Sequence, residues 1–312
     1  PGAIAMNRGR QPSVVVLTVL ALVAIVAACS PSGGLGQVPS RAPTPAPASS
    51  AAPNGSPDAS PPASPGTTTI VRTYFYLGGE PGSAGLVSLL REVPETRALA
   101  GAAMSALLAG PTADESAERV ITSAVPAGSR LLGLSIENGS ATVDLSSEFE
   151  SGGGSASVFI RLGQVVYTLT QFPTVQSVVF EIEGRPVTVF SSEGIVLDGP
   201  VGRDDYDDLL PAIFVDRPAY GAGVGNPARI TGSANVFEAA FLVTLLDGSG
   251  ATIAQVPAMA TCGTGCRGTF DVTVPYSVPE AGWGTLRVWD GSAKDGSPEN
   301  VREYPVWLTP AG

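Results

Sequence analysis

Residues 30–66 are the feature that most limits what this chain can fold into. The stretch consists almost wholly of Pro, Ser, Ala, Gly and Thr, and Arg41 and Asp58 are its only charged residues. Such a segment buries too little apolar surface to offset the entropy lost on ordering, so we expect disorder with polyproline character. The linker, residues 30–67, therefore separates an N-terminal leader from about 245 residues that can fold, enough for two ordinary domains.

The leader, residues 1–29, has the pattern of an export signal. Arg8 and Arg10 form a positive region, and residues 14–28 form an apolar run interrupted only by Thr18. The run is shorter than the roughly 20 residues of a membrane-spanning helix, but it fits the apolar part of a secretory signal peptide. A plain secretory signal and an uncleaved anchor are the alternatives to the interpretation that follows.

The end of the apolar run, Val26-Ala27-Ala28-Cys29, resembles a bacterial lipoprotein box. The resemblance implies that Cys29 is the lipid attachment site and becomes the first residue after cleavage. Each buried methylene of an acyl chain contributes about 0.8 kcal/mol of membrane affinity, so acylation can anchor a protein without a spanning helix. We therefore expect an extracytoplasmic lipoprotein on the outer face of the cytoplasmic membrane, with a linker that can extend about 115 Å.

Charge and the lack of histidine exclude several classes of function. The 17 basic and 28 acidic residues give a net charge of −11, and the chain after the leader carries 15 − 28 = −13. This balance argues against nucleic acid as a partner. With no histidine in the sequence, Ser-His and Cys-His nucleophiles and imidazole metal sites are excluded. We expect no enzyme activity and no cofactor.

Cys262 and Cys266, separated by Gly-Thr-Gly, are predicted to form a disulfide, because an extracytoplasmic compartment permits one. Two free thiols are the alternative. So short a loop gains little from closure and would pin a loop rather than a domain.

Residues 68–200 are predicted to form an α+β domain. Enrichment in β-branched and aromatic residues predicts strands at 69–77 and 86–93, and helical spacing predicts helices from about 95 to Gly110-Pro111 and over 155–172. Asn138-Gly139 predicts a hairpin of 132–138 with 139–145, and Glu183-Gly184 one of 178–182 with 186–190. The order ββαββαββ predicts two helices on one face of a mainly antiparallel sheet.

Several motifs in this segment resemble the GerM-type domain of sporulation and spore-germination lipoproteins. They are Thr73-Tyr74-Phe75-Tyr76, Leu107-Leu108-Ala109-Gly110-Pro111, Val125-Pro126-Ala127-Gly128-Ser129, Ala141-Thr142-Val143-Asp144-Leu145-Ser146 and the run from Gln164 to Phe172. Their order and spacing over about 120 residues carry the resemblance. It implies a fold akin to ring-building modules of envelope complexes, without catalytic residues.

Residues 212–312 are predicted to form an immunoglobulin-like β-sandwich. Seven short β-rich runs, at 212–215, 228–233, 241–246, 251–256, 269–274, 284–289 and 302–308, are separated by Gly, Pro and Asp turns. This segment resembles the immunoglobulin-like domain that often follows a GerM-type domain, through Pro218, the run from Asn226 to Ala234, Phe237-Glu238-Ala239, Asp247-Gly248 and the run from Ala293 to Ser297. The cysteine spacing departs from an antibody-type bridge between sheets.

Residues 201–211 are expected to be an acidic interdomain linker. Asp204, Asp205, Asp207 and Asp208 could supply oxygen ligands to Ca²⁺, but their spacing does not match an EF-hand. We favour a solvated segment that mutual repulsion keeps extended, so that the domains can reorient.

Other candidate groups have simpler explanations. Asp144 and Glu148 suggest a glycosidase pair, although 28 acidic residues offer such pairs by chance. Ser292 and Lys294 miss the Ser-x-x-Lys spacing, and residues 221–226 end in Asn226 where a dinucleotide loop needs glycine. Trp283, Trp289 and Trp307 are interpreted as core or sheet-face residues rather than a sugar platform.

Taken together, these features predict a non-enzymatic envelope lipoprotein that binds other envelope proteins as a tethered scaffold, with sporulation or germination as the setting that the resemblance suggests. The alternative is a lipoprotein that binds cell-wall glycan or peptide.

Overall fold

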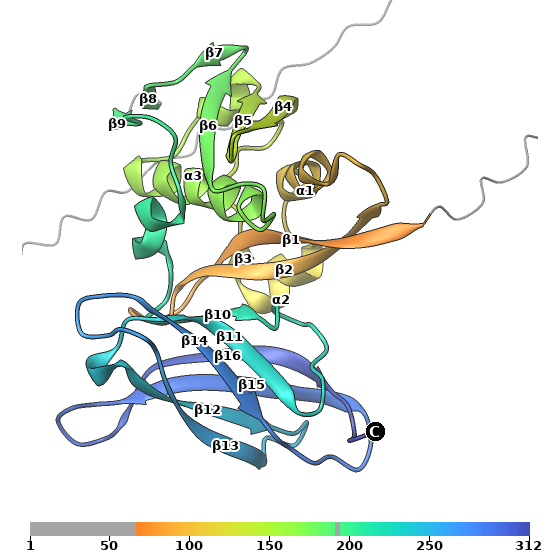
Figure 1. The fold of residues 1–312 in the computed structure, drawn as a ribbon, viewed down its shortest axis with the longest axis vertical. Helices are drawn as coiled ribbons and strands as arrows, with labels where there is room; N and C mark the ends of the chain where they lie inside the picture. The colour runs from red at the N-terminus through yellow and green to blue at the C-terminus, as the bar shows by residue number, and fades with distance from the viewer. Residues whose placement is uncertain (1–66, 191–193) are drawn as a thin grey trace, which may run out of the picture. The chain divides into compact units, whose positions relative to one another are not determined.

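Two modules build the part of the chain that the computed structural model describes, residues 67–190 and 194–312, without the side chains of Glu118 and Arg119 (Figure 1). The leader, Cys29 and nearly all of the linker lie outside these residues, so the expectations for them stay predictions. No helix within the described ranges is both long and apolar enough to cross a membrane. Both modules belong to one compact unit, Pro61–Gly312.

The N-terminal module begins with a three-stranded sheet in the order β2-β1-β3. Its strands are β1 (Thr68–Leu77), β2 (Gly85–Pro94) and β3 (Ile121–Thr122), and the helices α1 (Leu99–Leu108) and α2 (Ala113–Arg119) lie between β2 and β3 in the chain. Thr73, Tyr74 and Phe75 on β1 are all fully buried. Since successive strand side chains point to opposite faces, β1 is covered on both faces.

A second sheet, in the order β4-β5-β6-β7, completes the module. Its strands are β4 (Leu131–Glu137), β5 (Ser140–Leu145), β6 (Ser177–Ile182) and β7 (Arg185–Pro186), followed by the small pair β8 (Val189–Phe190) and β9 (Ile195–Val196). The long helix α3 (Ser155–Leu169) connects β5 to β6, which pair in parallel, as a crossover requires. Asn138 and Gly139 have φ of +50° and +84°, so the predicted hairpin turn is confirmed.

The α+β class is confirmed, and the structure changes four details of it. The strands divide into two larger sheets and the separate β8–β9 pair instead of one sheet. The first helix begins at Leu99 because Pro94 is still the last residue of β2, where Thr68 is its partner. The expected final hairpin is split: β6 pairs with β7, whereas β8 pairs with β9. The seven-residue helix α2, which begins with a Thr112–Glu115 capping box, is not expected from apolar spacing because it carries no apolar stripe.

The C-terminal module is the expected immunoglobulin-like sandwich. All seven strands are present: β10 (Ile213–Arg217), β11 (Ala228–Ala234), β12 (Ala240–Leu246), β13 (Thr252–Met259), β14 (Gly268–Val274), β15 (Gly282–Gly291) and β16 (Pro298–Leu308). They form sheets in the orders β10-β11-β14 and β13-β12-β15-β16. Phe241 on β12 and Phe270 on β14 pack edge to face, with ring centroids 4.8 Å apart, in the core between the sheets.

The expectation of an extended, solvated segment at residues 201–211 is wrong. Residues Arg203–Leu209 form a short 3₁₀ helix, η2, whose Tyr206 and Leu209 are buried. The Tyr206 ring lies 4.8 Å from that of Phe159 on α3. Burial of these apolar groups holds the segment against α3, while Asp204 and Asp208 remain exposed to solvent, which screens their repulsion.

Candidate functional site

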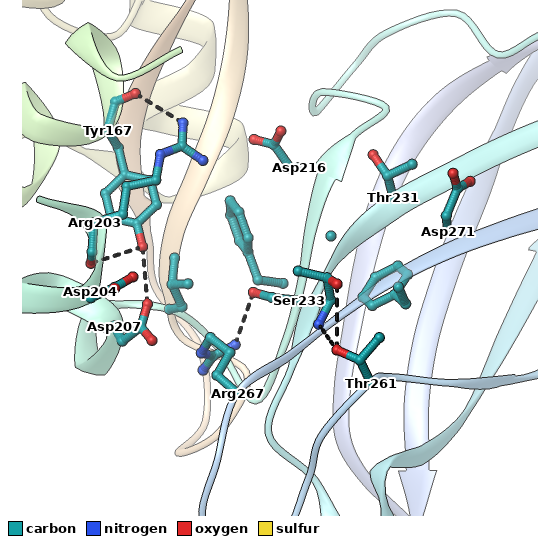
Figure 2. A pocket seen from close by; sticks show the side chains of 15 residues that line it. Tyr167, Arg203, Asp204, Asp207, Asp216, Thr231, Ser233, Thr261, Arg267 and Asp271 are labelled. Atoms are coloured by element: carbon teal, nitrogen blue, oxygen red, sulfur yellow. Dashed lines mark hydrogen bonds between the residues drawn. The ribbon is translucent and has the colours of Figure 1, made fainter. Parts of the chain in front are cut away.

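A cavity of about 620 Å³ lies between the two modules (Figure 2). Its walls come from α3 and η2 on one side and from β10, β11, β14 and the loop before β14 of the sandwich on the other. Its lining residues are Tyr167, Arg203, Asp204, Asp207, Leu210, Phe214, Asp216, Thr231, Gly232, Ser233, Thr261, Arg267, Thr269, Phe270 and Asp271. Two arginines and four aspartates make it the largest gathering of charged groups in any described cavity, so we treat it as the candidate site.

Arg203 on η2 lies against two tyrosine rings that also contact each other. Its guanidinium carbon lies 4.7 Å from the Tyr167 ring centroid and 5.6 Å from that of Tyr74. Its Nε donates to Thr170 Oγ1 at 2.8 Å, and Nη2 donates to the Tyr74 hydroxyl and the Tyr167 carbonyl, both at 3.4 Å. Burial alone would lower the pKa of Arg203, but the Coulombic effect of Tyr74 and Asp216 raises it above its ordinary value. Arg203 is therefore a fixed cation.

The tyrosine hydroxyls act as fixed donors. The Tyr74 hydroxyl donates to Asp216 Oδ1 at 2.5 Å. Burial, followed by the negative charge of Asp216, raises the pKa of Tyr74 well above its usual range. Burial, followed by the charge of Asp207, does the same to the pKa of Tyr167, whose hydroxyl lies 3.4 Å from Asp207 Oδ1. Both hydroxyls thus keep their protons at neutral pH.

The opposite wall carries Arg267 (Figure 2). Its Nη2 donates to the Pro211 carbonyl at 3.1 Å, and Nη1 donates to Ser233 Oγ at 3.4 Å. Burial lowers the pKa of Arg267, and burial raises the pKa of Asp207, although each opposes the shift of the other. Arg267 thus links the Pro211 carbonyl, just after η2, to Ser233 on β11 of the sandwich.

A second contact between the modules centres on Arg302 of β16, which is 3% exposed. Its Nη1 donates to the Ser83 carbonyl at 2.6 Å and its Nη2 to the Leu86 carbonyl at 2.8 Å. Backbone bonds lie beside it: Ala212 N–H to the Gly82 carbonyl at 2.7 Å, and Tyr220 N–H to the Ser88 carbonyl at 2.9 Å.

We call these two contacts together the joint, made of Tyr74, Tyr167, Arg203, Asp216 and Arg302. The joint consists of hydrogen-bond donors and acceptors that pair with one another in fixed positions. Such an arrangement is suited to holding two modules in one orientation.

The four aspartates considered for Ca²⁺ do not converge. Asp205 accepts from the Gly202 N–H at 2.7 Å and so caps η2. Asp204 and Asp207 line the cavity, and Asp208 is exposed. Within residues 67–190 and 194–312, no three or more His, Cys, Asp or Glu side chains are grouped so that they could hold a metal ion.

Asp144 and Glu148 have structural contacts. Asp144 Oδ1 accepts from the Gly184 N–H at 2.9 Å and so supports the β6–β7 turn. Glu148 lies 3.6 Å from Arg130, and its pKa is lowered by a hydrogen bond with Ser146, then by its own backbone N–H. A glycosidase acid needs a raised pKa, so these contacts do not favour that role for Glu148.

The remaining candidates lie in loops. Ser292 and Lys294 occupy the turn between β15 and β16, where the Ser292 carbonyl accepts from the Gly296 N–H at 2.8 Å. Residues 221–226 run along β16, and a strand rather than a helix follows them. Cys262 and Cys266 are adjacent in the β13–β14 loop, with Cα atoms 5.8 Å apart, a separation that suits the predicted bridge.

Two of the tryptophans form an exposed pair on the outer face of the larger sandwich sheet. Trp283 on β15 lies opposite Trp307 on β16, with ring centroids 5.4 Å apart and rings nearly perpendicular. Trp283 is 51% exposed and Trp307 is 39% exposed, whereas Trp289 is half-buried. They are sheet-face residues, as expected.

Sequence reasoning missed the joint residues Tyr74, Arg203, Asp216 and Arg302. For Arg302 a signal exists: Tyr304, Val306 and Leu308 are the inward residues of β16, and Arg302 has the same parity. An arginine at an inward strand position indicates a buried contact, because a charge is buried only where partners satisfy it.

Comparison with known proteins identifies both modules. Residues 73–188 match the Germane family, described as "Sporulation and spore germination", and residues 212–297 match Gmad2, the "Immunoglobulin-like domain of bacterial spore germination". No curated protein matches the chain.

Three solved structures are partly similar to this chain. The tandem GerMN domains of the sporulation protein GerM from Bacillus subtilis are 17% identical, over 61% of this chain and 60% of that one, with a TM-score of 0.38. The first GerMN domain of the same protein is 20% identical, over 44% and 99%, with a TM-score of 0.37. A putative lipoprotein from Clostridium perfringens is 18% identical, over 46% and 92%, with a TM-score of 0.32. The chain thus spans about 60% of the tandem structure.

Proposed function

We propose that this chain, which carries a Germane domain followed by a Gmad2 immunoglobulin-like domain, is a lipid-tethered envelope scaffold without enzymatic activity. In this proposal Cys29 carries the lipid, the Pro-rich linker sets the reach, and the two modules bind other envelope proteins. Confinement at the membrane raises the effective concentration of the modules at their partners.

The joint is the observation that carries the proposal. Arg302 is buried at the boundary between the modules, and its two Nη atoms donate to carbonyls of the N-terminal module, while the half-buried Arg203 donates to Thr170. Ordering the side chains of these contacts costs conformational entropy. The result is that the two modules are held in one orientation. A fixed relation is useful to a protein that must present both modules to one assembly at the same time.

Crosslinking in cells tests the proposal. A photoreactive residue is placed at Val196 in the N-terminal module or at Met259 in the C-terminal module, which are 61% and 70% exposed. We expect discrete protein adducts from both positions, and we expect Cys29→Ala to deplete them by releasing the chain from the membrane. Adducts that are absent from both modules, or that persist unchanged in the Cys29→Ala chain, would contradict the proposal.

The exposed Trp283–Trp307 pair favours a second candidate, binding of cell-wall glycan or peptide. Aromatic faces with one wet side suit sugar rings and amphipathic ligands. Retention of the full chain on purified peptidoglycan should be saturable and should fall at least tenfold when both tryptophans become alanine. Met259→Ala, which removes an exposed apolar side chain from the edge strand β13 at the other end of the same sheet, is the control. Equal retention of all three chains would remove this candidate.

A further inference from the structure

Strand β4 lies at the edge of its sheet and pairs with β5 alone. The geometry of the β4–β5 hairpin decides which backbone groups of β4 face outward. Across the two-residue Asn138-Gly139 turn, Glu137 and Ser140 exchange hydrogen bonds, and such pairs alternate along an antiparallel ladder. Ile136 and Leu134 are therefore the non-bonded positions. Their N–H and C=O groups point away from β5, toward the open edge.

An apolar strip accompanies this edge. Leu132 is 45% exposed, Ile136 is 39% exposed, and Leu134 between them is half-buried. Ile136 and Leu134 lie opposite Ala141 and Val143, which are fully buried. Leu134 and Ile136 therefore belong to the buried face of the sheet and are partly exposed because no further strand lies beyond β4, while Leu132 lies at the register shift beside them.

A groove of about 360 Å³ continues the strip toward the first turn of α1. Its lining residues are Arg97, Ala98, Leu99, Ala100, Gly101, Leu134, Ile136, Phe172 and Thr174. An added strand beside β4 would place its own inward side chains in or next to this groove, since alternate strand residues share a face.

Three other strand edges carry protective features, whereas that of β4 is largely open. The edge of β13 contains Pro257, and β7 is two residues long and ends in Pro186. The edge of β16 is covered by residues 221–224, which exchange hydrogen bonds with Pro305 and Trp307. In β4 the only features that discourage pairing with a further strand are a register shift near Leu131 and the terminal Glu137. The residues from Leu132 to Ile136 include no charged residue and no proline.

Charge decides which occupant fits. Arg97 is the one charged residue that lines the groove, and within the described residues it makes no ion pair. A second copy of the chain would bring a further net charge of −11, which repels at long range. The edge therefore fits an extended segment with alternating apolar residues and a carboxylate near one end.

We propose that β4 is a docking edge at which an extended segment of a partner protein adds as a fifth strand, with its apolar side chains beside the α1 groove and an acidic residue near Arg97. This inference rests on the proposed function, because it takes the occupant of the edge to be a protein. It adds where that protein binds and which kind of segment it uses. Strand addition draws affinity from main-chain hydrogen bonds and specificity from alternate side-chain pockets.

The test uses the full chain in detergent and a fluorescein-labelled probe peptide, Asp-Val-Thr-Val-Thr-Val-Thr. Fluorescence anisotropy should show saturable binding, and a peptide methylated at alternate amide nitrogens should bind at least tenfold more weakly. Ile136→Pro removes the outward N–H while sparing the β4–β5 ladder, because proline is tolerated where a strand N–H faces solvent. We expect it to weaken binding at least tenfold, and Ile136→Ala, which keeps the N–H, to weaken it only a few fold.

Two further variants keep the test decisive. If Ile136→Pro does not fold, the double variant Leu132→Lys and Ile136→Lys blocks the edge by charge and should abolish binding. Arg97→Gln should weaken binding of the peptide several fold and should reduce the salt dependence of that binding. Binding that is absent at millimolar peptide, or insensitive to methylation and to these variants, would overturn the proposal. So would self-association of the full chain that Ile136→Pro abolishes, since the occupant would then be a second copy.

Failure here is distinguishable from failure of the scaffold function. If crosslinks from Val196 and Met259 persist in an Ile136→Pro chain and the peptide does not bind, the scaffold stands and the β4 edge is not its docking site. If peptide binding behaves as expected and neither module yields protein crosslinks in cells, the edge is functional in the purified chain and the scaffold proposal fails.

Discussion

At the scale of single residues, the joint shows how charged side chains are stabilised where two modules meet. Arg203 lies against the rings of Tyr74 and Tyr167, and Tyr74 in turn donates to Asp216. The Tyr74 hydroxyl and both Nη atoms of Arg302 have partners, whereas the buried Arg302 Nε has none among the described residues, so much of the desolvation cost is offset by hydrogen bonds that are stronger in a low-dielectric setting. None of these residues is unusual in sequence. Their importance comes from positions that are distant along the chain and adjacent in space.

The buried tyrosines predict a loss of stability at alkaline pH. Burial, with Asp216 for Tyr74 and Asp207 for Tyr167, raises both pKa values in the folded state above the unfolded value of about 10. Above that pH the unfolded chain releases protons that the folded chain retains, so stability is full below about pH 10 and falls as pH rises. Each tyrosine contributes a slope of up to about 1.4 kcal/mol per pH unit.

Urea unfolding between pH 8 and pH 11 measures this slope. Tyr74→Phe and Tyr167→Phe should each flatten it by up to one proton while lowering stability at pH 8 by about 1–3 kcal/mol through the lost hydrogen bond. Identical slopes for the wild-type chain and both variants would contradict the assignment of these hydroxyls as buried donors.

At the scale of elements, the contact between η2 and α3 depends on a missing side chain. A Cβ placed at Gly163 on α3 would lie 2.3 Å from Leu209 Cδ1 and 3.4 Å from the Tyr206 ring. Glycine in a helix interior costs about 1 kcal/mol relative to alanine, and here it allows η2 to pack closely. The acidic segment is thus ordered by packing, which composition does not reveal.

A pair of glycine variants tests this contact. Gly163→Ala should destabilise the chain by about 1–3 kcal/mol, because overpacking displaces Leu209 and Tyr206. The control is Gly101→Ala on α1, where the nearest atom to an added Cβ is 4.0 Å away, so helix propensity should stabilise the chain by up to about 1 kcal/mol. Chemical denaturation measures both. Equal effects of the same sign would show that η2 does not pack on α3.

At the scale of the whole molecule, the joint makes the two modules one unit. Arg302 lies on β16 of the sandwich and donates to two carbonyls near the start of β2. Its loss leaves the Ser83 and Leu86 carbonyls without those donors, at about 1–3 kcal/mol for a buried group. The modules should then move more freely relative to each other.

Arg302→Met tests the coupling. We expect its free energy of unfolding to fall by about 2–4 kcal/mol, and we expect faster amide hydrogen exchange in β2 and β10. The matched control is Arg287→Met on the adjacent strand, since Arg287 forms a half-exposed ion pair with Glu303 and such pairs contribute no more than about 1 kcal/mol. If both variants lost the same small amount, Arg302 would not hold the modules together.

The sequence by itself determined the two-module division, the seven sandwich strands and the Asn138-Gly139 turn. These features follow from signals within a few residues: alternation of period two, and glycine or asparagine where φ is positive. Tertiary structure alone decided the division of the N-terminal strands among separate sheets, the packing of η2, the contact of Arg203 with Tyr74 and Tyr167, and the pairing of Arg302 across the modules. The physical reason is that burial depends on which distant surfaces meet. The sequence shows that a residue is an arginine, but it does not show whether the side chain contacts water or a carbonyl more than two hundred residues away.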